Sequence, residues 1–190
     1  MSVWPTLSDG VVTLGPFLTE DVDAHVAGED EEHARRFGWW PDRSNNSTAL
    51  AAFEQWRRDW EENGATRSFA TRRADTGVLV GGCQLRFREK RMAELSYWTF
   101  PSHRGRGFAR CAAALVCRFA FQNLGVERIE AYVEPDNAAS RRVVEGVGFR
   151  EEGLVRKREL TQHGERKDMT LYGLLPADLV SSKDSHGMGI

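Results

Sequence analysis

The stretch PSHRGRGFAR, residues 101–110, joins a strand-like run to a long apolar run and holds three arginines and two glycines. A helix is expected to begin within it, and the first N–H groups of a helix lack intrahelical partners and carry roughly half a positive charge. Gly105 and Gly107 let the backbone approach a ligand with no Cβ in the way, and the guanidinium groups fit phosphate oxygens. The stretch therefore predicts an anion site, most simply one for a pyrophosphate. A glycine-rich turn with solvated arginines is the alternative.

Strand and helix patterns alternate on both sides of this stretch. Hydrophobic alternation and turn residues predict strands at 11–14, at two runs within 67–87 joined at Asp75-Thr76-Gly77, and at 91–100, 126–133, 149–160 and 167–175. Apolar residues at helical spacing predict helices within 18–29 (with Thr19 as its N-cap), 47–63, 107–125 and 137–149. Because a helix connects them, the strands at 93–100 and 126–133 are expected to be parallel neighbours.

Length and composition exclude several classes of protein. A chain of 190 residues predicts one domain, which we place at 1–178, followed by a disordered tail at 179–190. The formal net charge of −2 argues against a general nucleic-acid binder, and no apolar stretch approaches the roughly 20 residues of a membrane span. Three cysteines without CxxC spacing fit a reducing cytoplasm. The five histidines are scattered, so no metal site is expected.

The motif Arg104-Gly105-Arg106-Gly107-Phe108-Ala109 matches the pattern R/Q-x-x-G-x-G/A. It resembles the pyrophosphate loop of the GNAT superfamily of acyltransferases. The segments AELSYWTFPSHRGRGFA, RFAFQNLGVERIEAYVEPDNAASRRVVEGVGFREEG and GERKDMTLYGLL are similar to the RimJ/RimL branch of that superfamily. The resemblance runs in consistent order from about residue 67 to 175 and continues more weakly over 7–63. Three such motifs in sequence are far more specific than one.

The resemblance implies an α+β fold with a mostly antiparallel sheet, splayed in the middle and flanked by about four helices. Acyl-CoA would bind in the V between the parallel strands, with its pyrophosphate on the loop at 104–109 and its pantetheine arm along one strand edge. The residues implied to bind it are Trp98, Thr99, Phe100, Arg104, Gly105, Arg106, Gly107, Phe108, Ala109 and Asn137.

Catalytic roles follow partly from chemistry and partly from the resemblance. Backbone N–H groups near Trp98 are the expected oxyanion donors. A water-activating base is expected at Glu159, which matches the RimL-type position, or at Glu94, where other branches place their base. Ser140 matches the serine that protonates the CoA thiolate, and no tyrosine is seen in NAASRRVVEG to replace it. Each residue also has a structural alternative: an ion pair for Glu159, a solvated strand position for Glu94, and a local hydrogen bond for Ser140.

We therefore predict a cytoplasmic N-acetyltransferase that moves an acetyl group from acetyl-CoA to a primary amine within a ternary complex. The acceptor would be a protein α-amine or a small cationic amine. It would enter near the acidic run at 20–32 and the segment FGWWPD at 37–42, where one tryptophan is expected in the core and the other on a pocket wall. An acyl-CoA sensor without turnover and a transferase for succinyl-CoA are the alternatives. No nucleic acid, membrane or metal is expected, and a homodimer is left open.

Overall fold

The computed structural model describes residues 4–89 and 91–179. One eight-stranded sheet runs in the order β1-β2-β3-β4-β5-β6-β8-β7. Its strands are β1 Leu7–Ser8, β2 Val12–Gly15, β3 Thr66–Arg73, β4 Leu79–Glu89, β5 Met92–Thr99, β6 Arg128–Val133, β7 Arg150–Leu160 and β8 Arg166–Leu174. The α-helices are α1 Val22–Gly28, α2 Glu31–Phe37, α3 Asn46–Glu61, α4 Phe108–Asn123 and α5 Ala138–Val147. Short 3-10 helices lie at Thr19–Asp21, Pro101–His103 and Pro176–Asp178.

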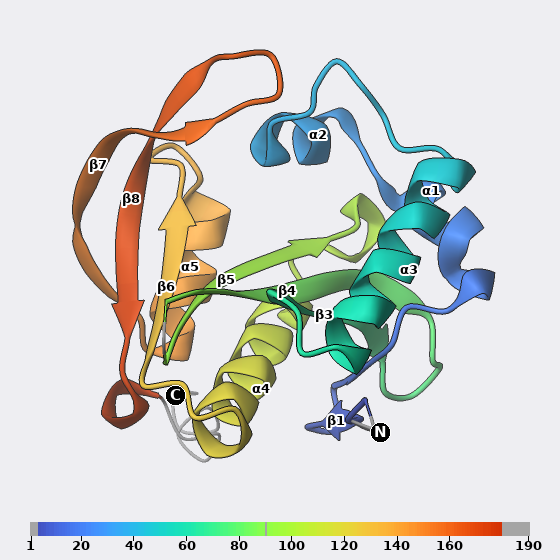
Figure 1. The fold of residues 1–190 in the computed structure, drawn as a ribbon, viewed down its shortest axis with the longest axis horizontal. Helices are drawn as coiled ribbons and strands as arrows, with labels where there is room; N and C mark the ends of the chain where they lie inside the picture. The colour runs from blue at the N-terminus through green and yellow to red at the C-terminus, as the bar shows by residue number, and fades with distance from the viewer. Residues whose placement is uncertain (1–3, 90, 180–190) are drawn as a thin grey trace, which may run out of the picture.

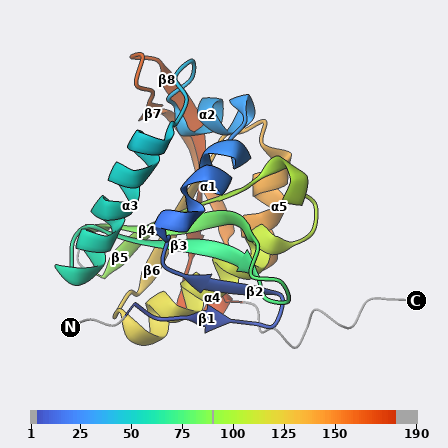
Figure 2. The same ribbon diagram turned by 90° about the vertical axis from the view of Figure 1, so that its right-hand side faces the viewer.

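Helices cover both faces of the sheet. The helices α1 and α3 lie against β3 and β4 on one face, while α4 packs across β1 to β5 on the other and contacts α5 (Figures 1 and 2). The predicted α+β fold, the final hairpin and the mostly antiparallel sheet are confirmed. The tail predicted at 179–190 lies, beyond Leu179, outside the described residues.

The acidic segment differs from the single helix expected at 18–29. Thr19 begins a 3-10 turn rather than capping a helix, and Asp21 accepts a hydrogen bond from the N–H of Leu18 there. The chain is then extended at Glu29, and the Asp30 side chain caps the N–H of His33. A side-chain cap of this kind starts a new helix. The described residues therefore contain five α-helices instead of about four.

The parallel contact between β5 and β6 is confirmed, but it is short. Its registered pairs are Met92 with Arg128, Ala93 with Ile129, and Glu94 with Glu130. Beyond them β5 continues to Thr99 and β6 to Val133 while the strands diverge (Figure 1). The backbone groups on the facing strand edges are consequently available to other partners.

Residues on β5 alternate between two hydrophobic clusters, which fixes the direction of each side chain. Leu95 and Tyr97 join the cluster beneath α4, whereas Trp98 packs with Phe17 and Phe53 beneath α1 and α3. The Trp98 indole lies directly over Gly82 of the neighbouring strand, so that a Cβ at this glycine would overlap the ring. Tyr97 and Trp98 therefore flank the splayed region from opposite faces of the sheet.

We expect Gly82→Ala to destabilise the protein. A Cβ there would overlap the Trp98 indole and lie 2.8 Å from the Cζ atom of Phe17, and overpacking of this kind costs about 1–3 kcal/mol. Urea unfolding measures the loss. Gly15→Ala is the matched control, because nothing lies within 4 Å of a Cβ at that strand glycine. Equal stability of the two variants would contradict the packing of Trp98 described above.

Candidate active site

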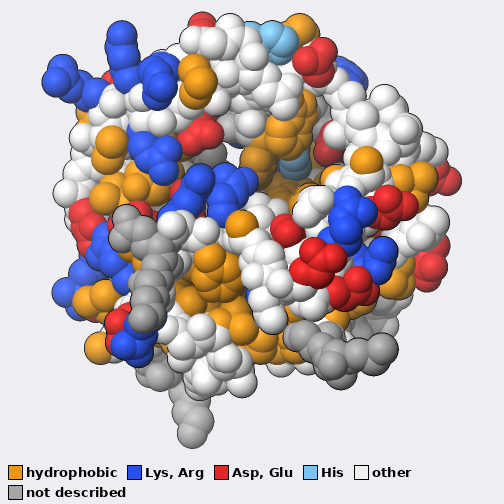
Figure 3. All heavy atoms as spheres, viewed as in Figure 1, with side chains coloured by type: hydrophobic (Ala, Val, Ile, Leu, Met, Phe, Trp, Pro, Cys, Tyr) orange, Lys and Arg blue, Asp and Glu red, His pale blue; other side chains and the backbone are white. Residues whose placement is uncertain are grey.

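A cavity of about 610 Å³ occupies the splayed region and is lined from both faces of the sheet. Tyr97, Asn137 and Ser140 line it on the α5 side. Trp98, with side chains of α1, α2 and α3, lines it on the opposite side. Figure 3 shows a hollow in the middle of one face of the molecule, with hydrophobic and histidine side chains on its wall. Side chains from both faces of the sheet therefore meet at one cavity beside β5 and β6.

The loop at 104–109 has the backbone geometry of an anion site. Gly105 and Gly107 adopt positive φ angles of 74° and 80°, which favour glycine. Nothing lies within 4 Å of a Cβ built at either position. Gly107 is the N-cap of α4 and supplies no side-chain cap, so the first N–H groups of this helix are left for a ligand. The geometry of the loop fits a diphosphate.

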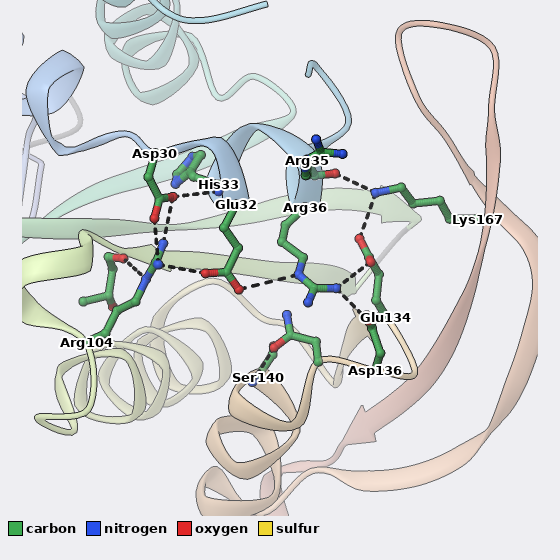
Figure 4. A network of polar contacts seen from close by, with 12 residues as sticks. Asp30, Glu32, His33, Arg35, Arg36, Arg104, Glu134, Asp136, Ser140 and Lys167 are labelled. Carbon is green, nitrogen blue, oxygen red and sulfur yellow. Dashed lines mark hydrogen bonds and ion pairs between the residues drawn. The ribbon is translucent and has the colours of Figure 1, made fainter. Parts of the chain in front are cut away.

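Arg104, however, is already held by carboxylates. Its guanidinium Nη1 lies 2.8 Å from Asp30 and 2.8 Å from Glu32 at the start of α2, and its Nε donates to the carbonyl of Thr99 (Figure 4). Burial acts to raise the pKa of Asp30, but the hydrogen bond from Arg104 and the N–H of His33 bring that pKa below its usual value. A diphosphate arriving at this loop has to compete with two acidic side chains for Arg104.

The predicted residues Asn137 and Ser140 lie together at the start of α5. The Asn137 side chain caps the N–H of Ser140 at 3.0 Å. The Ser140 hydroxyl lies 2.7 Å from the hydroxyl of Tyr97, which also lies 3.0 Å from the Ser140 carbonyl. Burial raises the pKa of Tyr97. A tyrosine is thus present beside Ser140, although none occurs in the α5 sequence, because β5 delivers it across the splayed region.

Both candidate bases line the same cavity, and Arg158 lies between them. Glu94 has a side chain only 18% exposed and pairs with Arg88 at 3.1 Å and with Arg158 at 3.5 Å. Glu159 is 46% exposed and lies 3.9 Å from Arg158. Glu94 is therefore the more strongly neutralised carboxylate, whereas Glu159 is open to water.

Of the three strand positions predicted to contact pantetheine, one lines the cavity. Trp98 lines it directly, and Thr99 follows on the β5 edge that β6 leaves unpaired. Phe100 is buried, and its N–H donates to the carbonyl of Val80. Arg106 is exposed on the loop, whereas Phe108 is buried at the start of α4. Their binding roles remain predictions.

Sequence reasoning missed a buried group on the α1–α3 side of the cavity. His25 and His33, noted from the sequence only as scattered and without metal-ligand spacing, line the cavity with Glu29. Burial lowers the pKa of His33 to about 4, so this imidazole is neutral at pH 7. Trp39 lines the same wall, whereas Trp40 lies outside it, beneath the Arg35 guanidinium at 4.8 Å.

Residues 4–89 and 91–179 contain no cluster of three His, Cys, Asp or Glu side chains suited to a metal ion. Over the same residues, none of the helices combines the length and hydrophobicity of a membrane span.

A sheet opened between parallel strands, an anion loop at a helix start and a cavity lined from both faces define a class of enzyme that transfers an acyl group from coenzyme A. Residues 12–150 match the family model described as Acetyltransferase (GNAT) domain, and the chain belongs to this family. The predicted fold and family are therefore confirmed, and the chain is an N-acetyltransferase with acetyl-CoA as its donor substrate.

Three similar proteins cover between 62% and 94% of the chain. The uncharacterized N-acetyltransferase YoaA of Bacillus subtilis is 27% identical over 91% of this chain and 98% of its own length. The uncharacterized N-acetyltransferase p20 of Bacillus licheniformis is 31% identical over 62% of this chain and 66% of its own. The solved structure of Mycobacterium smegmatis RimJ in complex with CoA-disulfide has a TM-score of 0.77 and 27% identity, covering 94% of this chain and 89% of that one. The similarity to RimJ supports the predicted RimJ/RimL branch.

We expect Arg104→Ala to weaken CoA binding about ten-fold or more. The variant would lack the charge-assisted contact predicted between Arg104 and phosphate, and would leave Asp30 and Glu32 unneutralised. Isothermal titration with CoA measures the dissociation constant. Arg57→Ala on α3 is the control, because this exposed arginine pairs with Glu61 of its own helix. Unchanged affinity in the Arg104 variant would remove this side chain from the CoA site.

Proposed function

We propose that the acceptor is a primary amine, either a protein α-amine or a small cationic amine, and that it reaches the thioester from the α1–α3 side. The observation that carries this proposal is a cavity lined by side chains from both faces of the sheet. The anion loop, Asn137 and Ser140 lie toward α4 and α5, so acetyl-CoA would occupy that side. The remaining side, with its acidic and aromatic lining, is left for the amine.

An α-amine needs little help to react. Its ordinary pKa of roughly 7.7–8.0 leaves it partly neutral at pH 7, whereas that of lysine is roughly 10.4. A carboxylate acting through one water molecule is a sufficient base. Glu159 is the better candidate, since Glu94 is engaged by two arginines. The N–H groups on the unpaired β5 edge near Trp98 and Thr99 are candidates to stabilise the oxyanion.

The Tyr97–Ser140 pair supports a proton donor for the leaving group. As the amine nitrogen bonds to the carbonyl carbon, the C–S bond breaks and its electron pair stays on sulfur. The hydroxyl of Ser140 can then give its proton to the thiolate, while Tyr97, 2.7 Å away, can donate to the Ser140 oxygen. The surplus proton of the amine leaves through the base, which balances the step.

Release of free CoA tests the acceptor class. Purified protein and acetyl-CoA are incubated with a short peptide bearing a free α-amine and an internal lysine, with the same peptide Nα-blocked, and with small alkyl and aryl amines. We expect thiol release with the free α-amine or the small amines and far less with the blocked peptide. Release with the blocked peptide alone would place the reaction on lysine and contradict the proposal.

Glu159→Gln is expected to lower kcat about a hundred-fold and to leave the KM for acetyl-CoA unchanged, because general bases contribute typically 10²–10⁴-fold. Glu94→Gln is the matched variant, since both carboxylates line the same cavity. We expect its kcat to fall much less. Steady-state kinetics with a fixed amine measures both constants. A full-speed Glu159 variant together with an impaired Glu94 variant would transfer the role of base to Glu94.

A further inference from the structure

Deeply buried carboxylates in this protein are generally paired with a guanidinium group. Asp21, Glu130 and Glu134 have side chains 8–16% exposed, and each lies 2.6–2.9 Å from an arginine. Glu29 is as deeply buried, with 10% of its side chain exposed, yet its ionic partner is only His25, at 3.3 Å. Within residues 4–89 and 91–179, no lysine or arginine pairs with Glu29. A buried charge normally requires such a partner, because desolvation is costly.

Glu29 is nevertheless held in its ionised form. Burial acts to raise its pKa, but hydrogen bonds from His25 and Ser44 bring the pKa below the usual range. The neighbouring His33 contributes no positive charge at pH 7, since its own pKa is about 4. Glu29 is therefore an ionised carboxylate on the cavity wall, and the cavity beside it has room for a further cation.

The local backbone explains why this carboxylate faces the cavity. Glu29 is the extended residue that ends α1, with φ −82° and ψ 135°. The adjacent Asp30 turns instead to Arg104 and to the start of α2 (Figure 4). The two consecutive acids therefore have different surroundings. Asp30 contacts Arg104 of the loop that fits a diphosphate, whereas Glu29 lines the cavity. Of the guanidinium groups that line the cavity, that of Arg36 is held by Glu134 and Asp136.

The wall around Glu29 is aromatic. The rings of Trp98 and His33 lie with their centroids 6.0 Å apart, and those of Trp98 and His25 lie 6.3 Å apart. Trp56 and Phe37 extend this wall from α3 and α2, with centroids 6.1 and 6.0 Å from Trp98. Aromatic faces attract cations and bury apolar groups. A carboxylate set among such rings is complementary to an ammonium group carried on apolar carbon.

We propose that Glu29 binds the ammonium group of the acceptor, and that the acceptor is a primary amine on an apolar or aromatic carrier with no carboxylate beside the nitrogen. This inference rests on the proposed entry of the amine from the α1–α3 side. It assigns Glu29 to recognition, while the base that removes the proton remains a separate residue. A carboxylate next to the amine would be repelled by Glu29.

Phenethylamine and phenylalanine serve as the test amines, because they differ only by a carboxylate. Glu29→Gln keeps the shape and hydrogen-bonding capacity of the side chain and removes its charge. We expect the KM for phenethylamine to rise about ten-fold or more, with the KM for acetyl-CoA unchanged. The preference for phenethylamine over phenylalanine should fall. A modest drop in the thermal midpoint is expected, because the lowered pKa of Glu29 means that the fold favours its ionised form. Glu20→Gln, at an exposed position outside the cavity, should match the wild type.

Tryptophan fluorescence during titration with phenethylamine, without acetyl-CoA, measures recognition apart from turnover. Binding by the wild type that is lost in Glu29→Gln supports the inference. If the wild type binds phenethylamine and Glu29→Gln does not, but the wild type releases no CoA in the enzymatic assay, the inference stands and the proposed acceptor reaction fails. Equal binding by the two proteins, or no binding by the wild type, overturns the inference. So do equal increases in the KM values for phenethylamine and for acetyl-CoA, which would show a structural role.

Discussion

Loss of pairing between β5 and β6 beyond Glu94 and Glu130 is the constraint on which the rest of the structure depends. A fully paired sheet would satisfy its own backbone and separate its two faces. Because these strands diverge, backbone groups of β5 are left for a ligand. The cavity beside them is lined by α1, α2 and α3 on one face of the sheet and by α5 on the other. The connection from β5 through the glycine loop to α4 and then to β6 places an uncapped helix start shortly after the end of β5.

Charge is distributed unevenly around this opening. Arg104 is engaged by Asp30 and Glu32, so α2 is tied to the loop that fits a diphosphate. At the other end of α2, Arg36 reaches Glu134 and Asp136 near Asn137 (Figure 4). The helix thus contacts both sides of the splayed region through ion pairs. Partly exposed pairs like these contribute little stability and exchange readily, which suits groups that must accommodate a charged substrate.

Much of the fold could be predicted from local sequence signals. The glycines at 105 and 107 indicated the loop, hydrophobic alternation indicated the strands, and the helix between them indicated a parallel pair. The break between α1 and α2 was missed because it depends on an Asp30 cap inside a continuous acidic run. Residue types around a motif predict its backbone well, since turns and caps are local.

The composition of the site was harder to predict, because its contacts join residues distant in sequence. Tyr97 reaches Ser140 across 43 positions, and a search confined to the α5 sequence could not find it. The carboxylates on Arg104 lie more than 70 positions away. The setting of Glu29 is defined by the lack of a lysine or arginine partner within the described part of the chain, and a sequence does not reveal which carboxylates will have such a partner after folding.

A crystal structure of the protein grown with CoA tests the central claim most directly. The account predicts that the pantetheine arm lies between the diverging ends of β5 and β6, beside Trp98 and Asn137, with the diphosphate on the N–H groups at 104–109. Electron density for CoA at any other surface, with the opening between the two strands left to solvent, would contradict it.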